Sequence, residues 1–176
     1  MKNLISLFLL LTIFLFWGCE TDPIMDPMDE AIVTRTVERP FKTTGFAYLQ
    51  LEVPDDIICD EGLDPRYALG QGNATHLGLY DIVITGCDDM TNGVNIGQAV
   101  HTAANGDILY MDYVLVKSPN EDDPPYISRS VFSPWTINGD MSTGRFEGAT
   151  GTGTGEITVN FMTGRMEWEG EGTITY

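Results

Sequence analysis

His76 and Tyr80 are the residues of this sequence best suited to proton transfer or to polar contact with a ligand. Histidine changes charge near neutral pH, so it can serve as an acid, a base or a ligand contact. His76 precedes an apolar segment and has the same alternating phase as Tyr80 and Ile82. We therefore expect His76 and Tyr80 as candidate ligand contacts in the interior of the fold. The alternative is that His76 bonds a backbone group and fixes a turn.

Cys59 and Cys87 are the two cysteines that follow Cys19 in the chain. Both lie in acidic segments typical of loops, next to Asp60 and Asp88. In an oxidising compartment they could form a disulfide, and their pairing would be unique. Two reduced, buried thiols are the alternative.

The metal-ligating residue types lack the spacing of a known metal site. The chain has only two histidines, His76 and His101, and no C-x-x-C motif, so we expect no structural zinc site. Acidic clusters occupy residues 55–56, 60–64, 88–89 and 121–123. None has the spacing of an EF-hand loop, although carboxylates from different loops could still converge on calcium. No phosphate-binding or dinucleotide motif occurs, and we expect no metal and no cofactor.

The chain begins with a short basic segment and an apolar run over residues 4–17, interrupted only by Ser6 and Thr12. As a helix this run would be roughly 21 Å long, shorter than a bilayer core of about 30 Å. The run therefore predicts the apolar region of a signal peptide.

Gly18 and Cys19 directly follow this run, and the junction resembles the lipobox of bacterial lipoproteins. The resemblance implies cleavage before Cys19 and acylation of its thiol. We therefore expect a lipid anchor in the cell envelope, at the outer membrane, on either its periplasmic or its surface face. Phe16 and Trp17 depart from the residues usual at those positions. An ordinary signal peptide and a short uncleaved anchor are the alternatives. Two or three lipid chains would make the anchor stable, because one chain binds a membrane only marginally.

The 157 residues after Cys19 are enough for one domain. Cleavage removes Lys2 and no carboxylate, so the net charge changes from −17 to −18. So acidic a surface repels nucleic-acid phosphates and anionic lipid headgroups, and we expect neither as a partner. We expect a signal peptide over residues 1–18, a Pro- and Asp-containing tether over 19–42, and a domain over 43–176.

From residue 43 onward the pattern is that of β-strands, with no convincing helix. Strands are predicted at residues 45–53, 66–75, 77–85, 98–103, 107–117, 129–137, 150–161 and 166–176. Asn105 and Gly106 are typical of a type I′ hairpin. Pro134 fits only an edge strand or a bulge.

The last two predicted strands are the most regular, with glycine and apolar residues on one face and threonine and glutamate on the other. Eight short antiparallel strands can hide their edges by closing into a barrel or by folding into a sandwich. We expect an all-β fold with a small antiparallel barrel of about eight strands. The glycines on the apolar face favour the barrel, because they allow sharp coiling.

Three glycine-containing segments carry a family resemblance: GNATHLG at 72–78, AANGD at 103–107 and TGRFEGATG at 143–151. The third is similar to an element that precedes the closing strands in the allene oxide cyclase and dirigent barrel superfamily. The first two look like segments of secreted bacterial proteins with a similar barrel. The resemblance implies a small eight-stranded barrel, often oligomeric, whose lumen can hold an apolar molecule. It implies no catalytic residues, because the shared positions belong to the scaffold.

Three functional hypotheses follow. The first is a non-enzymatic, lipid-anchored barrel that binds a small apolar ligand or a partner protein. The second is an isomerase- or cyclase-like enzyme that uses the lumen as its pocket. The third is a structural envelope protein with a filled lumen. A cavity lined by aromatic residues with one or two buried polar groups would favour binding or catalysis over the third hypothesis.

Overall fold

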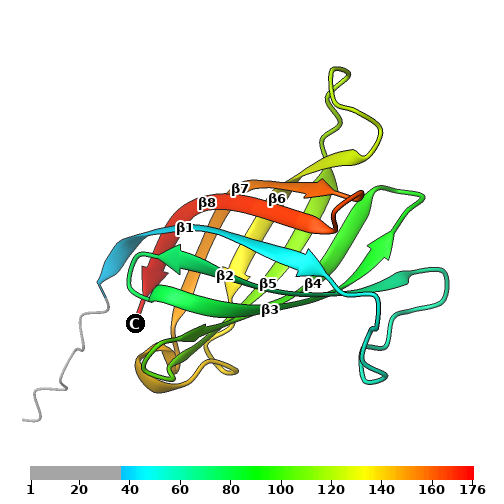
Figure 1. Ribbon diagram of the computed structural model, residues 1–176. Coiled ribbons are helices and arrows are strands. Elements are labelled where there is room, and N and C mark those ends of the chain that lie inside the picture. Colours follow the sequence, from blue (N-terminus) through cyan, green and yellow to red (C-terminus); the bar gives the residue numbers. More distant parts are fainter. Residues whose placement is uncertain (1–36) are drawn as a thin grey trace, which may run out of the picture. The chain divides into compact units, whose positions relative to one another are not determined.

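The computed structural model describes residues 37–176, which form a closed barrel of eight antiparallel strands (Figure 1). The strands are β1 (Glu38–Leu49), β2 (Asp64–Ala74), β3 (Gly78–Asp89), β4 (Val94–Ala103), β5 (Ile108–Lys117), β6 (Ile127–Ile137), β7 (Thr150–Asn160) and β8 (Arg165–Thr175). The predicted all-β, eight-stranded antiparallel barrel is confirmed. The predicted signal peptide, Cys19 and the tether up to residue 36 lie outside the described residues.

β1 closes the ring, because it pairs with β2 on one side and with β8 on the other. Every other strand pairs with its two neighbours along the chain, so no strand edge is left open. The strands and the buried core all belong to residues 38–176.

Side chains alternate between the interior and the outside along each strand, as the two-residue period of a β-strand requires. On β5, Leu109, Met111, Tyr113 and Leu115 are buried, whereas the residues between them are partly exposed. The inward face of β7 and β8 is rich in glycine, as predicted. The barrel core is thus built from one face of each strand.

Two tryptophans occupy the space that the inward glycines leave. A Cβ atom placed on Gly153 would collide with the Trp135 ring, and one on Gly172 would lie 2.7 Å from it. A Cβ atom on Gly45 would collide with the ring of Trp168. The glycines therefore allow two large rings to fit inside a small barrel.

Pro134 lies in a bulge of β6, where the register with β7 shifts between Val131 and Trp135. A proline has no N–H for the ladder, so a bulge is one of the few places where a barrel strand tolerates it. The hydroxyls of Thr152 and Thr154 donate to the carbonyls of Trp135 and Phe132 at 2.9 and 3.2 Å. These bonds satisfy carbonyl groups next to the irregularity.

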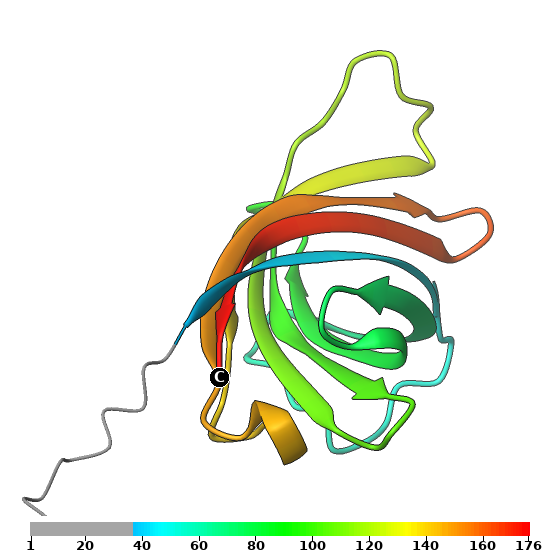
Figure 2. The same ribbon diagram turned by 90° about the vertical axis from the view of Figure 1, so that its left-hand side faces the viewer.

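One end of the barrel is closed by packed side chains, and we call it the closed end. Phe41, Leu77, Phe146 and Ile174 meet there, and all are buried. Phe146 comes from η2 (Gly144–Phe146), the short helical turn before β7. Figure 2 looks toward this end. Within residues 37–176, no helix is long and apolar enough to cross a membrane.

The opposite end, which we call the mouth, is formed by the loops of residues 50–63, 90–93, 118–126 and 161–164. In Figure 1 these loops lie on the right, whereas the chain enters β1 on the left, beside its C-terminus. The entry point of the chain and the mouth are thus at opposite ends of the barrel.

β1 begins at Glu38, five residues before the expected start of the domain at residue 43, and ends at Leu49 rather than at residue 53. Phe41 is fully buried, which extends the inward face of the strand toward its start. Pro40 is tolerated because β1 pairs only with β8 at that point and is there an edge.

Candidate functional site

An apolar cavity of about 110 Å³ occupies the barrel interior between its middle and the mouth. All eight strands contribute to its wall. The exposed residues Lys117 and Phe161 belong to its rim, so the cavity reaches solvent at the mouth. On the other side, the buried cluster of the closed end fills the interior.

Aromatic side chains line this cavity. Tyr113, Phe132, Trp135 and Trp168 line it from β5, β6 and β8. The rings of Tyr113 and Phe132 meet edge to face with their centroids 6.2 Å apart. Aliphatic residues complete the wall, among them Leu49, Ile82, Ile84, Leu115, Ile157 and Val159. Such a wall favours the burial of an apolar ligand surface.

His101 is a polar group buried in this wall. It projects inward from β4 and is 2% exposed. Its Nδ1 atom lies 3.2 Å from the carbonyl oxygen of Leu109. Because a carbonyl oxygen only accepts, Nδ1 carries a proton, and Nε2 of the neutral ring has a free lone pair. Burial lowers the pKa of His101 to about 4, against the opposite effect of the Leu109 carbonyl, so the ring is neutral at pH 7.

Thr43 and Tyr80 form a second buried polar group, beside His101. Their hydroxyl oxygens lie 2.7 Å apart. The Tyr80 ring packs edge-on against the His101 ring, with centroids 4.8 Å apart. Burial raises the pKa of Tyr80, and hydrogen bonds from Thr43 and Trp168 oppose this increase. Both hydroxyls are thus held in a fixed arrangement next to the imidazole.

The rim of the cavity is polar and carries charges of both signs. Arg66 and Asp88 form an ion pair there, with 3.2 Å between Nε and Oδ2. Burial raises the pKa of Tyr113, and the nearby negative charge of Asp88 raises it further. Tyr113 therefore stays neutral, and its hydroxyl donates to the carbonyl of Thr85 at 3.1 Å.

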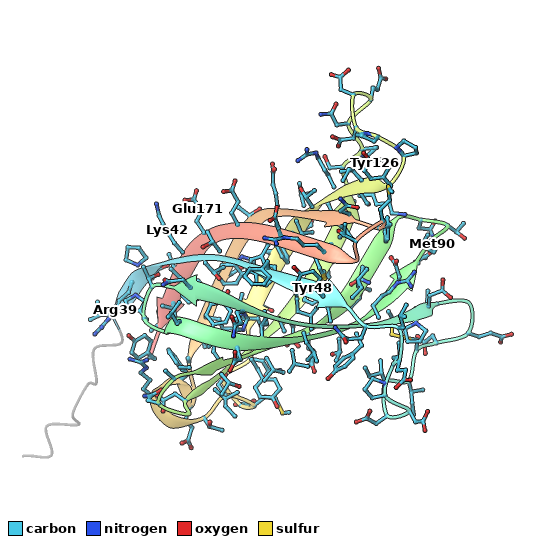
Figure 3. All side chains as sticks on the ribbon, in the orientation of Figure 1. Arg39, Lys42, Tyr48, Met90, Tyr126 and Glu171 are labelled. Carbon is cyan, nitrogen blue, oxygen red and sulfur yellow. A yellow bond between two sulfur atoms is a disulfide. The ribbon has the colours of Figure 1, made fainter. Side chains whose placement is uncertain are left out.

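Exposed apolar side chains project from each of the four mouth loops. They are Leu51, Ile58, Met90, Tyr126, Phe161 and Met162. Met90 and Tyr126 point outward at this end in Figure 3. An apolar rim of this kind around an apolar cavity is typical of a surface that meets a ligand or a partner.

A disulfide joins Cys59 in the loop of residues 50–63 to Cys87 near the end of β3, with 5.7 Å between their Cα atoms. Cys87 lies between Gly86 and Asp88, and Asp88 lines the cavity. Because side chains alternate along a strand, Cys87 points outward. The bond therefore fixes the loop to the outside of the barrel, next to the mouth.

The two candidate ligand contacts lie in different places. His76 is in the β2–β3 turn at the closed end, has a φ of 75°, and does not line the cavity. Its Nε2 atom donates to the carbonyl oxygen of Pro40 at 3.0 Å, and its ring meets that of Tyr176. Tyr80 lies inside the barrel, next to His101. His76 and Tyr80 would point to the same face only if the strand alternation continued through both residues. The turn interrupts this alternation, because His76 and Gly78 both have a positive φ.

His101 is the site residue that the sequence reasoning missed. The signal that could have found it is the alternation of Ala99, His101 and Ala103 before the Asn105-Gly106 turn. This pattern places a histidine on the small, apolar face of a strand. A histidine there must be buried once that face is known to point inward.

His101 gives this site a buried hydrogen-bonding group. Among residues 37–176, no group of three or more His, Cys, Asp or Glu side chains could hold a metal ion. His101 has a backbone carbonyl as the partner of Nδ1, where the histidine of a Ser-His-Asp triad has a carboxylate. What the neutral ring offers to a bound molecule is an acceptor at Nε2.

Comparison with family models, with curated proteins and with solved structures finds no match to this chain. The function therefore has to be inferred from the barrel and its cavity.

Proposed function

We propose that this protein is a lipid-anchored envelope protein whose barrel binds a small apolar ligand without catalysing a reaction. The observation that carries the proposal is the apolar, aromatic-lined cavity, which reaches solvent at the mouth and contains the buried His101. A filled lumen would have favoured a purely structural protein instead. The cavity favours binding, since burying apolar surface is the main source of affinity for such a ligand.

The volume of the cavity is suited to a ligand that contains about one ring. Its volume is about 110 Å³. An engineered protein cavity of roughly 150 Å³ binds benzene, so a molecule of that order is the natural occupant. A longer molecule would have to extend through the mouth, past Arg66 and Lys117.

The surroundings of His101 support binding over catalysis. A general base works best when its pKa lies near the operating pH. The pKa of His101, about 4, makes the ring a weak base at neutral pH. An isomerase- or cyclase-like activity of the lumen is therefore the less favoured proposal. Membership of the allene oxide cyclase and dirigent superfamily is likewise proposed, on the eight-stranded ring and the three sequence segments alone.

The proposed anchor at Cys19 is compatible with a mouth that stays accessible to a ligand. Residue 37 enters β1 at the closed end, so attachment through the preceding residues leaves the mouth free for a ligand. The excess of carboxylates keeps the domain in solution beside the membrane.

A titration with methylcyclohexane tests ligand binding directly. In residues 20–176, Trp135 and Trp168 are the only tryptophans, and both line the cavity. Their fluorescence should change in a saturable manner as the ligand enters. Ala99→Phe, which fills the cavity, should abolish the change, and Ala104→Phe on the exposed β4–β5 turn should preserve it.

Native mass spectrometry of the same purified protein should show an additional mass from a bound apolar molecule. A mass equal to that of the chain alone, together with unchanged fluorescence in the titration, would contradict the proposed function.

A second candidate function is the docking of a partner protein at the mouth. The exposed apolar residues on all four mouth loops favour it, and the acidic clusters of the same loops would suit a basic partner surface. A photo-crosslinking residue at Met162 should then give a discrete adduct in cells. The same residue at Met141, which is also exposed but lies at the closed end, should give none. Equal labelling from both positions would exclude the mouth as a specific docking surface.

A further inference from the structure

Two hydrogen-bond donors of the aromatic wall, those of Trp135 and Tyr113, are engaged within the protein. The indole N–H of Trp135 donates to the carbonyl of Thr154 at 3.3 Å. The hydroxyl of Tyr113 donates to the carbonyl of Thr85 at 3.1 Å. A ligand could use either donor only by leaving a backbone carbonyl without its partner, which is unfavourable in a buried site.

The hydroxyls of Thr43 and Tyr80 are engaged with each other. Their oxygen atoms lie 2.7 Å apart, and either hydroxyl can be the donor of this bond. The Tyr80 hydroxyl also lies 3.4 Å from the carbonyl oxygen of Thr44. At least one of the two hydroxyl hydrogens is therefore used within the protein.

His101 presents a lone pair. Its Nδ1–H is donated to Leu109, and the ring is neutral because burial lowers its pKa to about 4. Nε2 lies at the tip of the imidazole, farthest from the backbone. The buried polar atom that His101 offers to a ligand is thus an acceptor, and it needs a ligand that donates.

We propose that the cavity takes a neutral alcohol with about one six-membered ring, whose hydroxyl donates to Nε2 of His101. The carbon skeleton then packs against the aromatic and aliphatic wall. This assignment rests on the proposed function and names the class of its ligand.

Other ligand classes fit the same wall less well. A ketone or a carboxylate would bring another acceptor against the lone pair of His101, and both groups would stay unpaired. An amine of this size is charged at pH 7 and would lose its hydration in an apolar site. A pure hydrocarbon would leave Nε2 without a partner.

Three probes of nearly equal shape distinguish the contribution of the hydroxyl group to binding from that of the ring. They are cyclohexanol, cyclohexanone and methylcyclohexane. Each is titrated into residues 20–176, which include every strand of the closed barrel. Dissociation constants are taken from the shifts of backbone amide resonances. His101→Leu removes the acceptor at similar size. His76→Asn changes the other histidine, outside the cavity, to a residue that tolerates its positive φ.

We expect cyclohexanol to bind the unsubstituted protein about tenfold more tightly than cyclohexanone, as one buried hydrogen bond allows. His101→Leu should bring this ratio close to one, and His76→Asn should leave it unchanged. Equal affinities in the unsubstituted protein, or a preference that persists in His101→Leu, would overturn the alcohol assignment while ligand binding stands. Shifts from none of the three probes would overturn the proposed function itself. If His101→Leu does not fold, the ratio in the unsubstituted protein decides alone.

Discussion

The carbonyl oxygen of Leu109 lies 3.2 Å from Nδ1 of His101, and the two residues are directly opposite each other in the β4–β5 pair. This contact fixes the orientation and the tautomer of the imidazole from the neighbouring strand. Together with burial, it creates a neutral histidine inside a strongly acidic protein. Several properties of the barrel should depend on that neutrality.

The stability of the barrel should depend on pH through His101. Its pKa falls from 6.5 to about 4 on folding. Between these values the unfolded chain binds a proton that the folded chain does not bind. Above pH 6.5, His101 is neutral in both states and does not lower the free energy of unfolding. As the pH falls from 6.5 toward 4, the free energy of unfolding decreases, with a slope of up to about 1.4 kcal/mol per pH unit. Urea unfolding measured across this interval gives the slope.

The carboxylates of the chain also titrate at the lower end of this interval, so the informative quantity is a difference between variants. His101→Leu should lower the slope, and His76→Asn should retain it. Tyr80, which packs on His101, does not interfere, because burial raises its pKa. Parallel stability curves for the unsubstituted protein and His101→Leu would show that the histidine is not the group responsible.

Tyr80→Phe should destabilise the barrel by about 1–2 kcal/mol, because it leaves the buried Thr43 hydroxyl without its partner. Thr43→Val should cost a similar amount. The double variant should cost less than the sum of the two, with a coupling of about 1 kcal/mol, since both substitutions remove the same bond. Chemical unfolding of all four proteins measures the coupling. Strict additivity would mean that the two hydroxyls do not interact.

Gly153→Ala should be strongly destabilising. Its new Cβ atom would meet both the ring of Trp135, which is 1% exposed, and the backbone carbonyl oxygen of Glu171. We expect a loss of about 2–3 kcal/mol, typical of an overpacked core. Gly170→Ala is the matched control on the neighbouring strand, because its nearest contact would be 3.2 Å, to the carbonyl oxygen of Thr154. A thermal unfolding midpoint that falls equally in both variants would argue against a specific role for Trp135.

The last hairpin of the barrel could be predicted from the sequence almost in full. Residues 150–161 and 166–176 alternate without interruption, and the structure has β7 at Thr150–Asn160 and β8 at Arg165–Thr175. Pro134, which was predicted to fit only an edge strand or a bulge, lies at a bulge. These features follow from local rules, namely the two-residue period of a strand and the missing N–H of proline.

The start of β1 and the buried histidine could not be predicted in this way, because both depend on contacts between distant residues. Pro40 and Lys42 look like part of a tether until β8 supplies their pairing partners. His76 looked like an inward residue because nothing in the sequence reveals the positive φ of His76 and Gly78. His101 gained its importance only when its face of β4 was shown to point into the barrel, beside Tyr80 and Thr43.

The disulfide between Cys59 and Cys87 should contribute about 3.5 kcal/mol to stability, because it closes a loop of 28 residues in the unfolded chain. Reduction should lower the thermal unfolding midpoint of the unsubstituted protein. The Cys59→Ala/Cys87→Ala double variant should already have the lower midpoint and should not respond to reductant. In denaturant, both thiols should resist alkylation until the chain is reduced. Ready alkylation of the unfolded, unreduced chain would exclude the bond.

Labelling of the full chain with palmitate should depend on Cys19 alone. Cys19→Ala should remove the label, whereas Cys59→Ala and Cys87→Ala should retain it, because these cysteines belong to the barrel. The apolar run of residues 4–17 is too short for a stable span, so Cys19→Ala should also shift the protein from the membrane fraction to the soluble fraction. Label that persists in Cys19→Ala would contradict the lipid anchor. Loss of label with unchanged membrane fractionation would instead point to an uncleaved apolar segment as the anchor.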